Sequence, residues 1–217
     1  MKQSSYTIPL SYQINDQLAI GSGLTYSHIE LNQYVADIHG SGRVDAFYPQ
    51  LGLLFSPLEF LSLGASYTFE TRASRSTIDY EGDAHESVSS KILPSSYGLG
   101  CTLKPVDNLA LSLEFQQKNY SKANSETYND QSITKAGIEY SPTNFLALRL
   151  GYYNLPSYIK KGQAGYLIDT TQEFLTYGIG VNFNETMALN LGVQDSSIFK
   201  SGDIHKARYL VNLQIAI

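Results

Sequence analysis

Apolar and polar side chains alternate with a period of two along almost the whole chain. The first such segment places an apolar side chain at every second position: Tyr6, Ile8, Leu10, Tyr12 and Ile14. The last segment, 206–217, follows the same rule. Successive side chains of a β-strand point to opposite faces, so this period is what a strand with one apolar face requires. Helical i, i+3, i+4 spacing is not sustained in any segment, and we predict an all-β chain.

The alternating segments divide into 11 predicted strands, most of them about ten residues long. The strands are predicted at 5–14, 18–30, 43–55, 60–71, 94–103, 109–119, 132–141, 145–154, 172–183, 187–195 and 206–217. Short turns rich in Pro, Asn or Asp lie at 15–17, 56–59, 104–108, 141–144 and 184–186. Long polar loops alternate with them at 31–42, 72–93, 120–131, 155–171 and 196–205. Tight turns at one end and long loops at the other are typical of an up-and-down, transmembrane antiparallel β-barrel of the bacterial outer membrane.

A soluble barrel or sandwich is the alternative, and in it the apolar face would point inward. The composition of the two faces favours the membrane barrel. Small residues crowd the polar face: Gly21, Gly23, Gly64, Gly98, Gly100, Gly137, Gly151, Gly178, Gly180 and Gly192. The apolar face carries aromatic residues near the strand ends, as interfacial girdles do. They are Tyr12, Tyr26, Phe55, Tyr67, Phe69, Tyr97, Phe115, Tyr140, Tyr152, Tyr177 and Phe183.

Composition supports this interpretation and excludes several functional classes. Charged residues make up 16% of the chain, below the ~25% of ordinary soluble domains. The single Cys excludes a disulfide framework and a Cys-rich zinc site. The net charge of −5 provides no basic field for nucleic acid. No run approaches the ~20 apolar residues of a membrane helix, so the strands themselves would have to cross the bilayer.

The direction of the strands suggests a longer protein. The first residues contain no secretory signal. If the short turns are periplasmic, the first and last predicted strands both run toward the periplasm. A bacterial barrel normally has an even number of strands and both termini in the periplasm. We therefore expect the 217 residues to be the carboxyl-terminal portion of a longer barrel.

Several segments resemble the later strands of the outer-membrane long-chain fatty-acid and hydrophobic-compound transporter family (FadL/TodX-like). These segments are 93–100 with 104–113, 136–142 with 146–152, and 177–181 with 188–192. The resemblance covers roughly 45–217. It implies a 14-stranded barrel, an amino-terminal plug, a lateral exit through the wall and uptake of hydrophobic compounds.

Set against that family, 1–217 is predicted to be a single outer-membrane barrel domain that lacks its plug and first strands. It would hold about 11 of 12 to 14 strands. The chain ends on Ile217, where such barrels usually end in Phe. Because the family's early elements have no counterpart here, no ligand-binding residue is carried over.

Five ionisable residues are predicted to face the lumen: Glu70, Glu114, Lys135, Glu139 and Arg149. In the predicted register Glu139 and Arg149 lie diagonally across one hairpin, close enough to pair. One interpretation is a polar contact for the carboxylate of a substrate. The other is an ion-pair network that fills the lumen and fixes the register.

No catalytic, metal or cofactor site is predicted. No nucleophile, base and orienting group converge, so we do not expect an enzyme. The acidic residues of the loop at 72–93 do not have the spacing of a calcium loop and are interpreted as a solvated surface. They are Asp79, Glu81, Asp83 and Glu86, with His85 among them.

Most cations are predicted to lie near the long loops, where they could neutralise lipopolysaccharide phosphates. They are Arg43, Arg72, Arg75, Lys91, Lys118, Lys122, Lys160, Lys161, Lys200, Lys206 and Arg208. We predict a transporter barrel for hydrophobic small molecules such as long-chain fatty acids. The alternatives are a structural or scaffold barrel associated with secretion and a non-specific porin. The expected partners are outer-membrane lipid, lipopolysaccharide, the hydrophobic substrate and barrel-assembly machinery, and nucleic acid is not among them.

Overall fold

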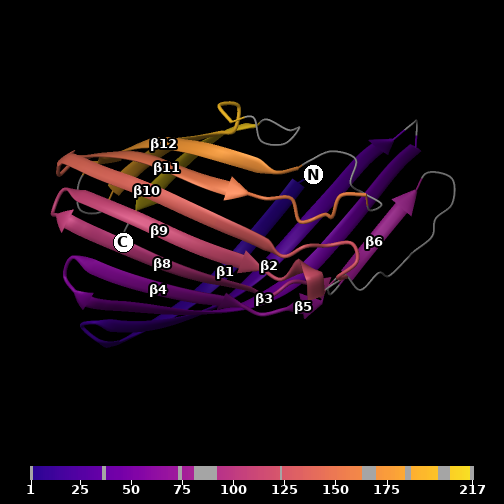
Figure 1. Cartoon of the computed structure of the whole chain (residues 1–217), viewed down its shortest axis with the longest axis horizontal. Coiled ribbons are helices and arrows are strands. Elements are labelled where there is room, and N and C mark those ends of the chain that lie inside the picture. Colours follow the sequence, from indigo (N-terminus) through magenta and orange to yellow (C-terminus); the bar gives the residue numbers. More distant parts are fainter. Residues whose placement is uncertain are drawn as a thin grey trace.

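The computed structural model describes residues 2–35, 38–72, 75–80, 92–122, 124–162, 170–183, 187–199 and 206–215. The main sheet has the strand order β1-β2-β3-β4-β8-β9-β10-β11-β12-β13-β14, in which neighbours are antiparallel. Its strands are β1 (Lys2–Asn15), β2 (Leu18–Val35), β3 (Ile38–Leu58), β4 (Leu61–Thr68), β8 (Ser96–Val106), β9 (Leu109–Lys118), β10 (Gln131–Thr143), β11 (Leu146–Leu155), β12 (Gln172–Asn182), β13 (Met187–Asp195) and β14 (Ala207–Ile215). Figure 1 shows this sheet curling into the wall of a barrel. The predicted all-β meander is confirmed.

Three short strands and one helical turn complete the described structure. β6 (Arg75–Tyr80) pairs with β3, and β5 (Thr71–Arg72) pairs with β7 (Ile92–Leu93). The 3₁₀ turn η1 (Tyr120–Lys122) follows β9. β1 and β14 lie at the two ends of the main strand order.

Two of the predicted loops are partly strand. The segment 31–42 continues the β2–β3 hairpin, whose pairing extends to Val35 opposite Ile38. Part of 72–93 forms β6, which runs beside 40–45 of β3. The polar composition of these segments predicts loops, but a hairpin that extends beyond a bilayer can be polar on both faces and still pair its backbone groups. The acidic residues Glu81, Asp83 and Glu86, with His85, lie outside the described residues.

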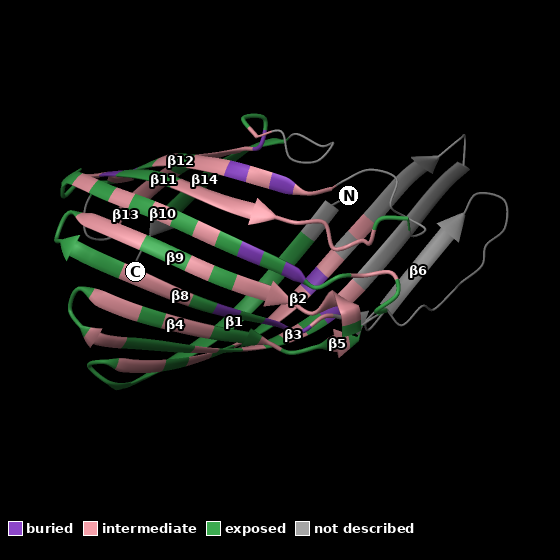
Figure 2. Cartoon of the chain, viewed as in Figure 1, coloured by how far each residue is buried: buried purple, intermediate pink, exposed green. Residues whose placement is uncertain are grey.

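Most large apolar side chains of the described chain are exposed on the outer side of the sheet. Along β10 exposure alternates from residue to residue over most of the strand, as Figure 2 shows. Leu99, Leu113 and Val211 are 56%, 58% and 74% exposed, respectively. The buried apolar residues of the described part are Ala46, Ile133, Ala147 and Phe174. A soluble sandwich would bury its apolar face in a core, and this sheet presents that face to its surroundings.

Aromatic side chains lie on the outer side in two bands. Toward the long loops the rings form pairs, with centroid separations of 5.1 Å for Tyr26–Phe47 and 6.4 Å for Tyr97–Phe115. Near the short turns lie Phe60, Tyr140, Phe145 and Phe183, all exposed. Phe115 lies six residues after Leu109, the first residue of β9, which corresponds to about 20 Å along a strand. The two bands have the arrangement of the aromatic girdles at the interfaces of a bilayer.

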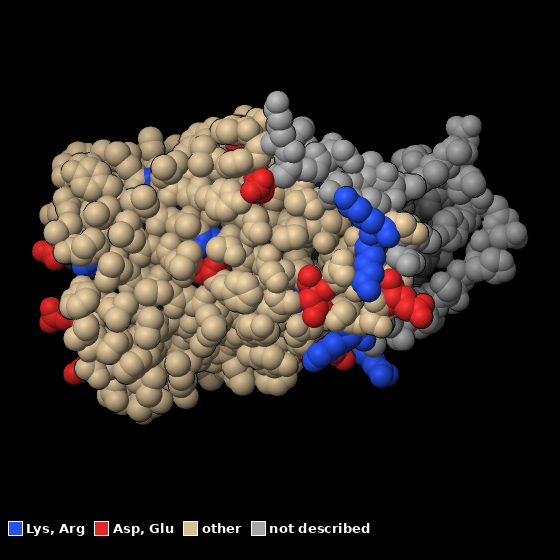
Figure 3. Space-filling model, viewed as in Figure 1, with Lys and Arg blue, Asp and Glu red and all other residues tan. Residues whose placement is uncertain are grey.

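Charged side chains avoid the surface between these bands. On the face shown in Figure 3 most charges lie toward the two ends of the molecule, and the surface between them shows few charged atoms. The short-turn end carries the exposed residues Asp16, Glu59, Lys104 and Asp107. Hydrocarbon is costly for charged groups, whereas both interfaces accept them. The outer surface therefore has the profile that a bilayer requires.

The assignment of faces predicts opposite outcomes for two adjacent residues of β9. We expect Leu113→Arg to lower the free energy of unfolding by about 2–4 kcal/mol in phospholipid vesicles, since it places a charge on the lipid-facing side. Ser112→Arg points to the interior and should cost much less. Guanidinium titrations of both variants in the same vesicles measure the difference. Equal losses would contradict the assignment.

Candidate functional site

The inner side of the wall lines an open cavity of about 1040 Å³. Its lining draws on β3, β4 and every strand from β8 to β14. Small residues dominate at inward positions: Gly64, Gly100, Ser112, Gly137, Gly151, Thr176, Gly178 and Gly192. Two larger apolar residues, Leu54 and Leu210, complete this part of the lining. The cavity thus has a smooth wall in which backbone atoms are accessible.

Glycine is required at two of these positions by close approach. A Cβ atom at Gly178 would lie 2.8 Å from the backbone oxygen of Leu191 on the neighbouring strand. A Cβ atom at Gly151 would lie 2.7 Å from Thr176 Oγ1 and 3.1 Å from the backbone oxygen of Ala136. Side chains here would push β11, β12 and β13 apart. The glycines therefore set the curvature of the wall as well as the width of the cavity.

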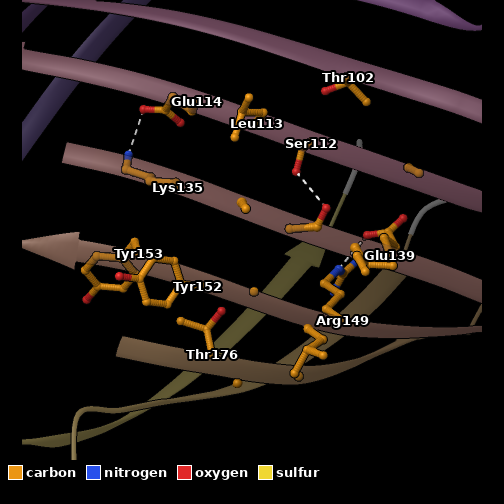
Figure 4. A pocket seen from close by; sticks show the side chains of 18 of the residues that line it. Thr102, Ser112, Leu113, Glu114, Lys135, Glu139, Arg149, Tyr152, Tyr153 and Thr176 are labelled. Atoms are coloured by element: carbon orange, nitrogen blue, oxygen red, sulfur yellow. Dashed lines mark hydrogen bonds and ion pairs between the residues drawn. The ribbon is translucent and has the colours of Figure 1, made fainter. Parts of the chain in front are cut away.

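One ion pair lies inside the cavity between β9 and β10. Glu114 and Lys135 are register partners, and Lys135 Nζ donates a hydrogen bond to Glu114 Oε1 at 2.7 Å. Both side chains are more than one third exposed. Figure 4 shows both of them projecting from adjacent strands toward each other. The sequence predicted both residues to face the lumen, and the structure brings them together.

A second ion pair lies between β10 and β11. Arg149 Nε donates to Glu139 Oε2 at 2.6 Å. The sequence placed these residues diagonally across the hairpin, but they are direct register partners. The register also shifts by one residue between Tyr140 and Thr143, close to the turn. Such a β-bulge is hard to place from sequence, and so is the register of the hairpin that follows from it.

The guanidinium of Arg149 is held by a third residue that the sequence analysis missed. Arg149 Nη1 donates to Asn190 Oδ1 on β13 at 2.6 Å. The guanidinium crosses Gly180 of β12, where a Cβ atom would lie 2.8 Å from Nη1. Asn190 lies between Leu189 and Leu191 in an alternating strand, so its inward position was predictable but its contact was not.

Glu70 is separate from this group. It follows the end of β4, is exposed and does not line the cavity. Its position just beyond the strand puts it toward the long loops. Of the five residues predicted to face the lumen, four therefore line the cavity as two ion pairs.

Two stacked aromatic residues lie at the part of the cavity toward the long loops. Tyr153 lines the cavity and stacks on Phe174, with ring centroids 4.7 Å apart. Phe174 is fully buried. The Tyr153 hydroxyl donates to Gln194 Oε1 at 3.3 Å, which links β11 to β13. These contacts give the upper cavity an apolar wall with one polar edge.

Beyond the strands, the loops after β9 and β11 are joined through tyrosines. Tyr120 stacks on Tyr158 with a centroid separation of 4.3 Å, and Tyr128 lies 5.8 Å from Tyr158. Tyr128 also forms a β-bridge with Ile159. Burial, with smaller contributions from Tyr158 and Tyr48, raises the pKa of Tyr120 to about 12. These contacts dock the described parts of the two loops on each other at this end of the barrel.

The described residues contain no group of three or more His, Cys, Asp or Glu side chains placed to hold a metal ion. Within the same residues, no helix has the length and hydropathy needed to cross a bilayer. Among the predicted rim cations, Lys160 Nζ donates to the backbone oxygen of Ser125 at 2.6 Å. Lys91 and Lys200 lie outside the described residues, and binding of lipopolysaccharide stays a prediction.

The arrangement suits reversible binding of an apolar molecule. The glycine-rich wall offers apolar contact at about 25 cal/mol per Å² of buried surface. The charged groups that line the cavity are already hydrogen-bonded to each other or to Asn190. Such a cavity can hold an apolar molecule without a covalent step or a cofactor.

The pairing of Glu139 with Arg149 should be measurable in a double-mutant cycle. We expect Glu139→Gln, Arg149→Gln and the double variant to give a coupling free energy of about 0.2–1 kcal/mol, because both side chains are partly exposed. Guanidinium unfolding in vesicles provides the four values. The Glu114–Lys135 pair serves as a matched comparison. A coupling of zero would show that the pair does not stabilise the hairpin.

The docked tyrosines should respond to alkaline pH. Since folding raises the pKa of Tyr120 from 10.0 to about 12, its contribution to stability is present below pH 10 and is lost as the pH rises toward 12. The ultraviolet absorbance of tyrosinate, compared between the native chain and Tyr120→Phe, isolates this group. A difference that titrates near pH 10 would contradict the buried, stacked arrangement.

The sequence matches no protein-family model and no curated protein. Solved structures do resemble the fold. The toluene transporter TbuX of Ralstonia pickettii superposes with a TM-score of 0.67 at 14% identity, over 99% of this chain and 69% of that one. A FadL homologue of Pseudomonas aeruginosa gives 0.63 at 15% identity, over 89% and 59%. The toluene transporter TodX of Pseudomonas putida gives 0.62 at 16% identity, over 97% and 67%.

The chain thus spans about three fifths to two thirds of the length of these structures. Their identity to this chain is low, so the likeness concerns the fold. The resemblance predicted from the sequence is confirmed at that level. The chain has the fold of the FadL-type outer-membrane hydrocarbon channels.

Proposed function

We propose that the chain forms the wall of an outer-membrane channel through which hydrophobic small molecules pass. The observation that carries the proposal is the inverted distribution of side chains. Large apolar residues cover the outer side, while a cavity of about 1040 Å³ lies within. A wall of this kind separates lipid from an interior that can hold a ligand.

Long-chain fatty acids and neutral aromatic hydrocarbons are the two candidate classes of cargo. The first comes from the resemblance in sequence. The second is supported by the names of TbuX and TodX, which are toluene transporters. The cavity is at the upper end of the range of ligand pockets, about 300–1,000 Å³, so it has room for either class. Apolar burial without strong polar anchors favours binding that is weak enough to allow release.

A passive, non-catalytic role agrees with the comparisons. TbuX, TodX and the monoaromatic hydrocarbon channel CymD are named as transporters or channels. In a channel the shape and polarity of the lumen determine which molecules pass. The driving force is the concentration gradient of the cargo.

Filling the cavity should stop uptake. A Cβ atom at Gly64 meets nothing within 4 Å, so Gly64→Trp combined with Ser112→Trp can place two indoles in the lumen without a backbone clash. We expect the accumulation of labelled toluene and labelled oleate by cells to fall toward that of cells without the gene, since passage is blocked while the outer wall is unchanged.

The matched control is Ala65→Trp with Leu113→Trp, which places the same rings on the outer side of the same strands. It should retain uptake, with equal amounts of each variant in the outer-membrane fraction. If native cells accumulate neither compound above cells without the gene, the proposed function is wrong. Equal uptake by the two Trp variants would show that the cargo does not use this cavity.

A further inference from the structure

The cations that line the cavity are neutralised within the wall. Arg149 is paired with Glu139 at 2.6 Å, and Lys135 is paired with Glu114 at 2.7 Å. The cavity lining therefore carries two positive and two negative charges, which sum to zero. Lys118 and Arg208 are also on the inner side of their strands, but neither lines the cavity.

The geometry of Arg149 limits what its guanidinium can do. Its Nε is occupied by Glu139, and its Nη1 by Asn190. Gly180 leaves room for the guanidinium beside β12, because a Cβ atom there would lie 2.8 Å from Nη1. Contacts on β10, β12 and β13 thus hold the cation against the wall, with its counter-ion beside it.

Binding of an anionic cargo at this wall would be unfavourable. A carboxylate that bound the remaining N–H groups of Arg149 would lie beside Glu139, and the two negative charges would repel each other. The same holds for Lys135 and Glu114. An uncharged molecule displaces neither partner and loses no ion pair. The cost to the anion is greater where the cavity has lost water to the cargo.

The space between the two ion pairs suits a flat apolar molecule. Lys135 and Glu139 lie four residues apart on the same side of β10, with Gly137 between them. Gly137 pairs with Gly151 on one side and with Ser112 on the other. Figure 4 shows Ser112 directed to the backbone of β10, so its hydroxyl is also occupied. An apolar surface therefore separates the paired charges.

From these contacts we propose that the channel selects uncharged hydrophobic molecules over carboxylates, and that Glu139 is the residue that determines this specificity by masking Arg149. Glu114 does the same for Lys135. The inference rests on the proposed function, because it concerns the cargo of the same cavity.

A matched pair of ligands tests the proposal. Toluene and benzoate share one ring and differ in a methyl or a carboxylate group. Equilibrium dialysis of the labelled compounds against the purified, folded chain at neutral pH should show benzoate binding at least about tenfold more weakly. Methyl benzoate retains the ring and the carbonyl group without the charge, and it should bind like toluene.

Glu139→Gln should expose Arg149 to the cargo. The ratio of benzoate affinity to toluene affinity should then rise about tenfold, the value of one charge-assisted hydrogen bond. The double variant Glu139→Gln with Arg149→Gln should restore the native ratio, because the cation is also removed. Glu59→Gln, at a short turn outside the cavity, should leave the ratio unchanged.

The outcomes distinguish a failure of charge masking from a failure of the proposed function. If neither toluene nor benzoate binds, the proposed function fails. If the native chain binds benzoate as tightly as toluene, or if Glu139→Gln leaves the ratio unchanged, charge masking is overturned and the proposed function stands. Should Glu139→Gln not fold, as judged by the mobility of unheated samples on gels, Glu114→Gln provides the same test at Lys135.

Discussion

The structure depends on one constraint, which is that a strand in hydrocarbon must give each backbone N–H and C=O group a partner on a neighbouring strand. In the described residues the meander satisfies this for the strands between β1 and β14 by pairing each one with both of its neighbours, and β1 and β14 are the edge strands. Most side chains are then not needed for backbone hydrogen bonds, and their polarity can match the surroundings on each side of the wall. The outer side is apolar because it meets lipid. The inner side is small and polar because the wall must curve around a cavity.

The glycines of the inner side affect both the curvature of the wall and the position of Arg149. Gly178 and Gly151 allow neighbouring strands to approach closely, and Gly180 leaves room for the guanidinium of Arg149. The same absence of side chains that bends the wall also brings Arg149 within reach of Asn190, two strands away. Shape and charge are therefore coupled, because a side chain at Gly180 would displace the cation that pairs with Glu139.

The sequence predicted most of the fold because the period-two signal is local. Strand positions, short turns and the two faces all follow from residues that are neighbours in the chain. The extension of β2 and β3 through 31–42 was missed, since polar residues there satisfy a strand outside hydrocarbon as well as a loop. The contact of Arg149 with Asn190 was missed for another reason. It depends on the relative register of three strands, and a one-residue bulge at Tyr140 to Thr143 changes that register.

The ion pairs illustrate why these two roles of charge should not be separated. From the sequence alone, an inward cation could form an ion pair that fixes the strand register, or it could bind the carboxylate of a ligand. In the structure the ion pair that fixes the register also changes what the cation can bind. Once Glu139 is directly opposite Arg149, the cation that could anchor an anion becomes part of a neutral wall. Register in a barrel thus decides which inward charges lie opposite one another, and a slip of two residues, which keeps each side chain on its face, would separate Glu139 from Arg149.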